Sequence, residues 1–350
     1  MKILHTLFLP LLILLSWLYG LTIWIRNGLF NVGLFTSISF DIPIISVGNI
    51  TMGGAGKTPM VIFLAKLLER SGYKPGIVSR GYRRNSKGLV IVHDGKSLLT
   101  DVNNAGDEPY LMGKELNTIP VIVSKNRIAG IRELLNNFSV EIVILDDAFQ
   151  HRKAGRIMDV VMISAYDKLI DYHLIPWGKL REPLRNLNRA QCIIYTNTKQ
   201  FQNPPQHNNL NAYYTNPPIA SIMQPTLMKI DNTGYHKSLP VNEPVFVFCG
   251  ISNPNSFIQT VKDVGLKIVG VKKFGDHKKY SAKTIQELSA LIKSNKCRVV
   301  VTTEKDIVKM PDNFIREFLF FVIKIDVVFE NDSEIIDLIG PVFSPLSSHR

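Results

Sequence analysis

The chain has 350 residues, of which 45% are hydrophobic, so it is long enough for two modest domains and too apolar to be disordered as a whole. Its 41 Lys and Arg residues outnumber its 29 Asp and Glu residues and give a net charge of +12, which indicates anionic partners: nucleic acid, anionic lipid or phosphorylated substrates. The three cysteines form no CxxC pair, which excludes a disulfide scaffold and a zinc-finger framework.

The first predicted element is an apolar helix at the N-terminus. Ile3–Ile25 contains no Asp, Glu, Lys or Arg, and a helix of that length reaches about 35 Å, enough to cross a hydrocarbon layer. It also carries three of the rings that favour a membrane interface: Trp17, Tyr19 and Trp24. No small-x-small signal-peptide cleavage site follows it. We expect residues 1–30 to form a membrane-associated helix, and Pro10 and Gly20 leave open whether it spans the bilayer or lies in one leaflet.

A glycine-rich turn between a predicted strand (Phe40–Val47) and a predicted helix (Pro59–Ser71) is the most specific signal in the chain. The turn consists of Thr51, Met52, Gly53, Gly54, Ala55, Gly56, Lys57 and Thr58. In such a loop the backbone N–H groups converge on phosphate oxygens, Lys57 reaches the β- and γ-phosphates, and the Thr58 hydroxyl binds Mg²⁺. Thr51 replaces the first glycine of the GxxxxGK[ST] pattern, but the remaining glycines supply the flexibility. The sequence therefore predicts an ATP-binding phosphate loop.

Carboxylates occur at two further places where such an enzyme would need them. Asp146 and Asp147 directly follow the predicted strand Glu141–Leu145, at the edge where open α/β sheets build their sites, so we expect a metal-binding carboxylate there. Asp107 precedes the predicted helix Tyr110–Leu116 and could act as a general base for a substrate hydroxyl, although the pattern alone favours a helix-capping role.

Arginines follow the predicted strand Gly76–Ser79 in the segment SRGYRR, where guanidinium groups suit either phosphate recognition or a solvated turn. His277 precedes a predicted helix, Ser281–Ser294, and by itself has no stronger reading than a cap or surface residue.

The alternation of strands and helices predicts an α/β fold: a P-loop NTPase-like, mostly parallel sheet with helices on both faces, a smaller C-terminal α/β domain and the N-terminal helix. We assign residues 31–200 to the kinase core and residues 244–350 to the C-terminal domain, which would close over the site. Residues 201–243 are rich in Asn, Pro and Gln and are expected to be a linker or edge segment, with a strand near Ile219–Ile230.

Seven short motifs resemble, in order, those of the lipid A 4'-kinases (tetraacyldisaccharide 4'-kinases): SVGNITMGGAGKTP, SRGYRR, GDEP, DDAFQHR, LREP, FGDHKKY and VTTEKD. The resemblance implies transfer of the γ-phosphate of ATP, with Mg²⁺, to the 4'-hydroxyl of a tetraacylated glucosamine disaccharide 1-phosphate, giving lipid IVA. It also implies contact with lipid of the bacterial inner membrane, catalytic domains on the cytoplasmic side, and neither nucleic acid nor an obligate protein partner.

The same resemblance assigns roles to individual residues. Asp107 would be the general base and His277 would assist it, while Lys57 and Arg181 would neutralise the phosphates. The residues implied around the metal are Thr58, Asp147 and Glu182, and the sequence leaves open whether Asp146, Asp147 or Glu182 binds it directly. Those implied around the lipid headgroup are Arg80, Arg83, Gln150 and His151.

The main alternative is a membrane-tethered P-loop NTPase switch, whose output is a conformational change. A guanine-specific switch carries an N/T-K-x-D element, and the nearest segment here, residues 198–201, lacks the Asp. A P-loop ligase of small carboxylic acids would not need the apolar anchor. A nucleic-acid-binding module would require aromatic interleaving or a recognised fold that the basic residues here lack.

Overall fold

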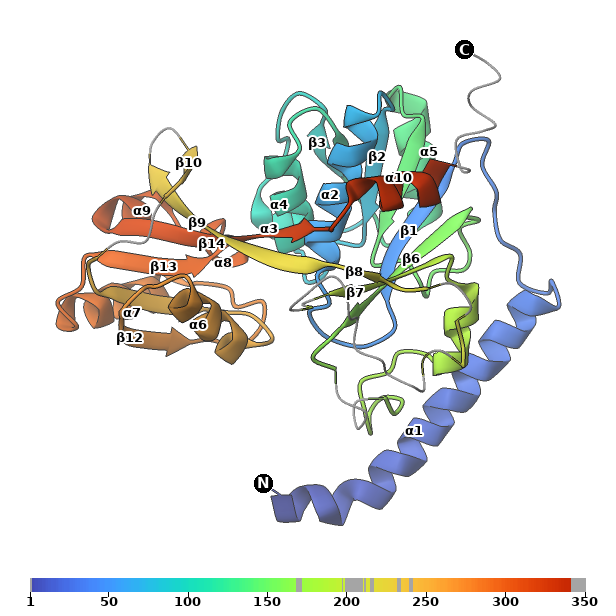
Figure 1. Cartoon of the computed structure of the whole chain (residues 1–350), viewed down its shortest axis with the longest axis horizontal. Helices are drawn as coiled ribbons and strands as arrows, with labels where there is room; N and C mark the ends of the chain where they lie inside the picture. The colour runs from blue at the N-terminus through green and yellow to red at the C-terminus, as the bar shows by residue number, and fades with distance from the viewer. Residues whose placement is uncertain are drawn as a thin grey trace.

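The computed structural model describes residues 2–167, 172–196, 198, 210, 212–214, 217–231, 234–238 and 242–340. It has a larger and a smaller lobe, each built on its own β-sheet, and a long N-terminal helix, α1 (Lys2–Asn31), which extends along the larger lobe (Figure 1).

The larger lobe is built on an eight-stranded sheet in the order β3-β4-β2-β5-β1-β6-β7-β8. Every pair is parallel except β3 with β4. The strands are β1 (Ile44–Asn49), β2 (Pro75–Ser79), β3 (Val90–Asp94), β4 (Pro120–Val123), β5 (Ile142–Asp146), β6 (Met158–Ser164), β7 (Cys192–Thr196) and β8 (Ile219–Ala220). The helices are α2 (Lys57–Arg70), α3 (Val102–Ala105), α4 (Asp107–Glu115), α5 (Arg127–Asn137) and the 3₁₀ helix η2 (Leu184–Arg189).

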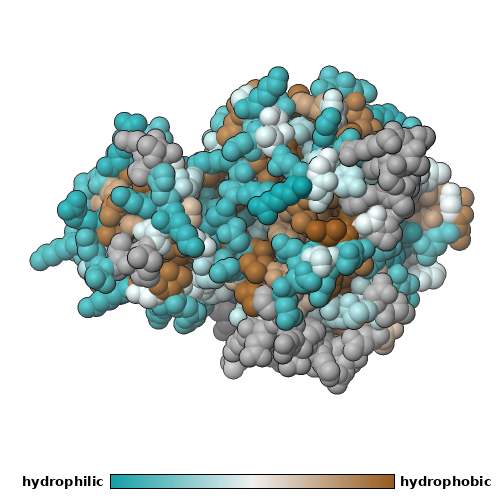
Figure 2. All heavy atoms as spheres, turned by 45° about the horizontal axis from the view of Figure 1, so that its top comes forward, coloured by the Kyte–Doolittle hydropathy of each residue, from teal (hydrophilic) through white to brown (hydrophobic). Residues whose placement is uncertain are grey.

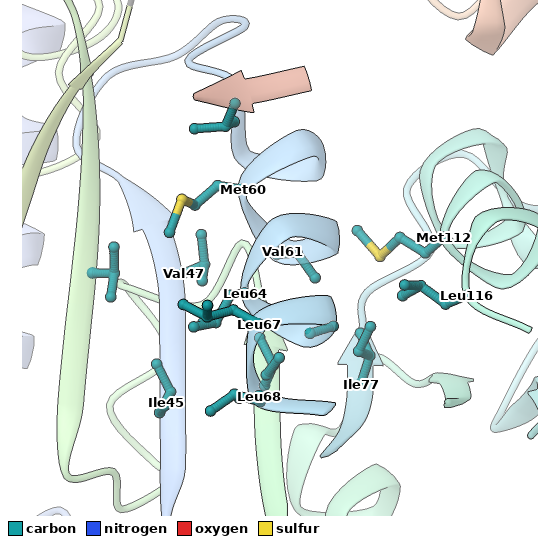
Figure 3. Packing of buried hydrophobic residues seen from close by; sticks show 14 of the residues in the cluster. Ile45, Val47, Met60, Val61, Leu64, Leu67, Leu68, Ile77, Met112 and Leu116 are labelled. Carbon is teal, nitrogen blue, oxygen red and sulfur yellow. The ribbon is translucent and has the colours of Figure 1, made fainter. Parts of the chain in front are cut away.

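Both faces of this sheet are covered, as the alternating pattern predicts. Successive residues of β1 point to opposite faces, so Ile45 packs with α2 and α4 whereas Ile44 packs with α5. On the α2 face, Val61, Leu64 and Leu68 pack against β1 and β2 (Figure 3). Burying each such side chain contributes about 1.5–3 kcal/mol. This packing fixes the N-terminus of α2 above the carboxyl end of β1.

The smaller lobe is built on a six-stranded sheet in the order β10-β9-β14-β13-β11-β12. Its strands are β9 (Ile222–Asp231), β10 (Gly234–Lys237), β11 (Val245–Cys249), β12 (Ile268–Lys273), β13 (Val299–Thr303) and β14 (Leu319–Val328). The C-terminal helices are α6 (Pro254–Asp263), α7 (Ala282–Ser294), α8 (Glu304–Ile307), α9 (Asp312–Glu317) and α10 (Asp332–Ile339). The two long strands β9 and β14 pair antiparallel over eight residue pairs and run between the lobes (Figure 1).

Two segments are placed differently from the divisions expected from sequence. Within the expected linker, Ile222–Asp231 forms β9 and Gly234–Lys237 forms β10 of the second sheet. Helix α10, within the expected C-terminal domain, packs on the core of the first, where Ile335 and Ile339 join the cluster around α2. Residues 201–209 lie outside the described residues. The chain therefore crosses between the lobes twice, at β9 and at β14.

Helix α1 contacts the larger lobe with one face only. Ser16 donates a hydrogen bond to the Leu174 carbonyl at 2.8 Å, and Tyr19 donates one to the Arg181 carbonyl at 2.6 Å. The opposite face exposes large apolar side chains: Phe8, Leu11, Leu14, Leu15, Trp17, Leu18, Leu21, Trp24 and Ile25. Phe8–Asn31 is long and apolar enough to cross a membrane. The face shown in Figure 2, by contrast, is largely hydrophilic over the smaller lobe.

Gly48 of β1 gives a direct test of this packing. A Cβ there would lie 2.7 Å from the Phe149 backbone nitrogen, which cannot move without shifting the segment after β5. We expect Gly48→Ala to destabilise the protein by about 1–3 kcal/mol and lower its Tm. Gly340→Ala is the control, since among the described residues no atom beyond its chain neighbours and its own helix lies within 4 Å of a Cβ there. Equal Tm values for the two variants would contradict this packing.

Candidate active site

The predicted phosphate loop lies between β1 and α2. Helix α2 begins at Lys57, two residues before the predicted start, because a helix tolerates Pro59 in its first turn, where the backbone nitrogen needs no partner. Gly53 and Gly56 have φ angles of 127° and 76°, which L side chains rarely adopt. A Cβ on Gly56 would lie 2.1 Å from Cε of Met223 on β9, so the loop packs closely against the strand that leads to the smaller lobe.

Lys57 and Arg181 converge on Asp147. The Asp147 Oδ1 atom lies 3.5 Å from the Lys57 ammonium and accepts a hydrogen bond from Arg181 at 2.8 Å. Burial opposes ionisation of Asp147, but the two cations outweigh it and lower the pKa of this carboxyl. Three residues with predicted roles in phosphate and metal binding therefore lie together, and Asp147 is ionised at neutral pH.

Asp146, the last residue of β5, is an equally suitable metal ligand. Its Oδ2 atom accepts a hydrogen bond from Ser79 at 2.6 Å, while its buried Oδ1 atom has no hydrogen-bond partner in the described parts of the chain. Burial, with the charges of Glu108 and Asp147, raises the pKa of Asp146 to about 6. Mg²⁺ prefers carboxylate, hydroxyl and phosphate oxygens, and Asp146, Asp147 and Thr58 supply such a set. These residues fit the metal that the resemblance implies.

Asp107 and His277 meet across the boundary between the two lobes. Asp107 is the first residue of α4, and its Oδ2 atom lies 3.1 Å from Nδ1 of His277 in the loop after β12. His277 has a left-handed φ of 55°, and its backbone nitrogen donates to the Gly250 carbonyl at 3.1 Å. The Tyr82 ring packs edge-on against the His277 imidazole, with the two ring centroids 5.1 Å apart. Residues 170 positions apart are thus held as a hydrogen-bonded pair.

Sequence reasoning missed Lys309, which contributes to the same pair. Its ammonium lies 3.2 Å from Asp107 Oδ2 and 3.2 Å from Asp306 Oδ1. Burial raises the pKa of Asp107, but His277 and Lys309 more than offset it, and the net pKa is lowered. Asp306 is itself fixed by the backbone N–H of Gly250 and the Tyr280 hydroxyl. The motif VTTEKD contains Asp306, but nothing in the sequence shows that Lys309 reaches the first lobe.

Glu108 and Lys305 form a second bridge between the lobes. Their side chains make a close ion pair, and Glu108 also experiences the charges of Lys57 and Asp147. The attraction of Lys305 outweighs burial and lowers the pKa of Glu108. Arg83 adds a third bridge, donating to the Asp276 carbonyl at 2.8 Å. The Asp107–His277 pair and the phosphate loop are therefore linked electrostatically through Glu108.

The four residues predicted around the lipid headgroup lie in two segments, Arg80 and Arg83 after β2 and Gln150 and His151 after β5. Arg80 is exposed at the carboxyl end of β2, and Arg83 lines a cavity of about 120 Å³ together with Asp107 and His277. Gln150 donates to the Asn49 carbonyl at 2.9 Å, and burial with nearby arginines lowers the pKa of His151 to about 4, so this imidazole is neutral.

In the described parts of the chain, the side chain of Glu182 contacts residues other than Lys57, Asp146 and Asp147. Its carboxylate is completely buried and accepts hydrogen bonds from Asn186 at 2.7 Å, Arg189 at 2.8 Å and Asn27 of α1 at 3.3 Å. These contacts join α1 to η2. The geometry favours this structural role for Glu182 over direct metal binding.

The Lys305–Glu108 bridge generates a prediction about stability. Lys305→Met leaves the Glu108 carboxylate, which is 26% exposed, without its cation, which costs about 1–3 kcal/mol. Lys293→Met is the matched control: it also breaks a close Lys–Glu pair, but Lys293 is 63% exposed and such pairs contribute about 0–1 kcal/mol. We expect a much larger fall in Tm for Lys305→Met. Similar falls would show that the bridge does not stabilise the contact between the lobes.

Comparison with known proteins agrees with this arrangement. Residues 8–342 match the family model described as Tetraacyldisaccharide-1-P 4'-kinase. The tetraacyldisaccharide 4'-kinase of Chlorobaculum tepidum is 37% identical over 299 residues, covering 84% of this chain and 85% of that protein. That of Desulfotalea psychrophila is 36% identical over 317 residues, covering 87% and 88%.

A crystal structure of LpxK from Aquifex aeolicus in complex with ATP aligns with a TM-score of 0.78 at 31% identity, covering 97% of this chain and 99% of that one. This similarity confirms the predicted P-loop NTPase-like α/β fold, and the relatives do not favour the alternative of an NTPase switch. The chain belongs to the tetraacyldisaccharide-1-P 4'-kinase family.

Proposed function

We propose that Asp107 and His277 activate the acceptor alcohol in the reaction of this family, transfer of the γ-phosphate of ATP to the 4'-hydroxyl of a tetraacylated glucosamine disaccharide 1-phosphate. One observation carries the proposal: a carboxylate from α4 and an imidazole from the smaller lobe meet at 3.1 Å, and the next residue of α4, Glu108, experiences the charge of Lys57 in the phosphate loop. A hydroxyl is a poor nucleophile until a positioned base accepts its proton.

The proton and phosphate transfers use the groups already described. Asp107 is ionised because its pKa is lowered, so it accepts the hydroxyl proton as the oxygen attacks the γ-phosphorus and the bond to the β-phosphate oxygen breaks. His277 and Lys309 hold Asp107 in place. Lys57 and Arg181 neutralise the phosphate charge, which is the main requirement of phosphoryl transfer. Thr58 with Asp146 or Asp147 would hold Mg²⁺, which would supply further neutralisation of the phosphate charge.

The acceptor sugar would enter from the cavity of about 120 Å³ beside the pair. Arg83, Asp107 and His277 line it, together with Lys279 and Lys309. This concentration of positive charge suits an anionic disaccharide. Arg80 at the end of β2 extends the same basic edge, and Gln150 and His151 would complete the headgroup site on the segment after β5.

The acyl chains would remain in the membrane that α1 contacts. The exposed apolar face of α1 explains how a hydrophilic catalytic body reaches a lipid substrate. Because ATP is cytoplasmic, the catalytic lobes belong on the cytoplasmic side of the inner membrane.

Replacing the base tests the reaction directly. In assays with labelled ATP, the acylated disaccharide 1-phosphate and water as competing acceptor, we expect Asp107→Asn to lower kcat about 10²–10⁴-fold with little change in ATP affinity. The control is Asp263→Asn, at an exposed position on α6. A loss confined to ATP affinity would reassign Asp107 to nucleotide binding, and label transfer only to water in the wild type would contradict the kinase proposal.

The membrane contact is tested on the exposed face of α1. Replacing Leu14, Trp17 and Leu21 with Asn removes apolar area available to the bilayer, and we expect vesicle binding to fall at least about 100-fold. The same replacements at Leu99, Ile157 and Val269, which are exposed elsewhere, are the control. Unchanged binding of the α1 variant would show that another surface provides the attachment.

A further inference from the structure

A polar cavity of about 430 Å³ lies between the C-terminal half of α1 and the 3₁₀ helix η2. Trp24 and Asn31 of α1 line one wall, and Arg185 and Asn188 of η2 line the other. Neither wall contains a residue that our functional proposal uses.

The cavity is strongly basic. Three guanidinium groups line it, those of Arg152, Arg185 and Arg189, and none of the lining residues found in the described parts of the chain is acidic. The nearby carboxylate is that of Glu182, which already accepts hydrogen bonds from three side chains and lies 4.0 Å from Arg26. The Glu182 carboxylate thus acts on Arg26, Arg152 and Arg189, and Asp159 is a second carboxylate that acts on Arg189.

The arginines lining this cavity differ in their hydrogen bonds: Arg152 donates to the Asn27 carbonyl at 3.1 Å and to Asn31 Oδ1 at 2.9 Å, whereas Arg189 has unused donors. Arg189 donates to Glu182 through Nη2, but its Nε and Nη1 atoms are buried without a hydrogen-bond partner among the described residues. Burial, and then the charge of Arg189, lowers the pKa of Arg152. A cluster of neighbouring cations, one of which has unpaired buried donors, is stabilised by an anion that accepts hydrogen bonds.

The position of the cavity restricts the source of that anion. Trp24 is 58% exposed at the end of the apolar face of α1, the place where amphipathic rings lie at the headgroup level of a bilayer. An anion that enters beside Trp24 would come from the membrane surface, and the charged groups at that level are lipid phosphates.

We propose that the cavity between α1 and η2 binds the phosphate group of a membrane lipid, with Arg152, Arg185 and Arg189 as its donors. Two sources carry this chemistry: an anionic phospholipid of the bilayer, and the 1-phosphate of the acylated disaccharide. Only the second source depends on the proposed function. In either case the site would hold α1 and the catalytic lobe at a fixed depth relative to the headgroups.

Arg185 is the residue to change. Its side chain is exposed, and in the described parts of the chain it makes no hydrogen bond that links α1 to the larger lobe. Arg185→Gln removes one charge from the cavity. The control, Arg132→Gln, removes one charge from an exposed position on α5, and Arg185→Lys retains the charge. One arm measures flotation with phosphatidylcholine vesicles with and without phosphatidylglycerol, in the absence of ATP and disaccharide. The other measures the KM for the disaccharide in neutral detergent micelles.

We expect Arg185→Gln to lose about five-fold in binding to phosphatidylglycerol vesicles, with partial rescue by Arg185→Lys, if a bilayer phospholipid occupies the site. A similar rise in the KM for the disaccharide, with the KM for ATP unchanged, would identify the 1-phosphate as the occupant. If Arg185→Gln matches Arg132→Gln in both arms, the proposal is overturned. The vesicle arm needs no turnover, so its failure is distinct from a failure of the kinase proposal.

Discussion

The contact between Asp107 and His277 is the constraint on which the rest of the site depends. Asp107 begins helix α4 of the larger lobe, and His277 lies in a loop of the smaller lobe, so neither lobe carries the pair alone. Lys309 and Lys305 both come from the second domain and both contact acids of α4. The N-terminus of α4 is therefore the place where the two domains meet chemically.

The connections between the domains suit this requirement. Strands β9 and β14 pair along eight positions, and α10 then returns to the core beside α2. The second sheet is thus joined to the first by a two-stranded ribbon and by a helix docked at its far end. A ribbon of this kind permits a change in the angle between the lobes, while partly buried ion pairs such as Glu108–Lys305 favour the arrangement in which the site is complete.

Much of this organisation could be predicted from the sequence because it depends on local patterns. The phosphate loop is one continuous segment after β1, and Asp147 directly follows the neighbouring parallel strand β5. The carboxyl ends of parallel strands meet at one edge of the sheet, so the proximity of Asp147 to Lys57 follows from that geometry. Resemblance linked Asp107 with His277, which no local pattern could do. The role of Lys309 and the contacts of Glu182 with α1 depend on how distant segments pack, and they had no signal in the sequence. Residues 332–339, which form α10, were assigned with the rest of the C-terminal segment because nothing in the sequence reveals which of two cores they cover.

The account is tested most directly by a double-mutant cycle on Asp107 and His277. The measured quantity is kcat for Asp107→Asn, His277→Asn and the double variant, with labelled ATP and the acylated disaccharide 1-phosphate. If the two side chains act as one unit, the double variant will be about as slow as the slower single variant. Losses that multiply would show that the two residues act independently and would contradict an active site assembled from both domains through this contact.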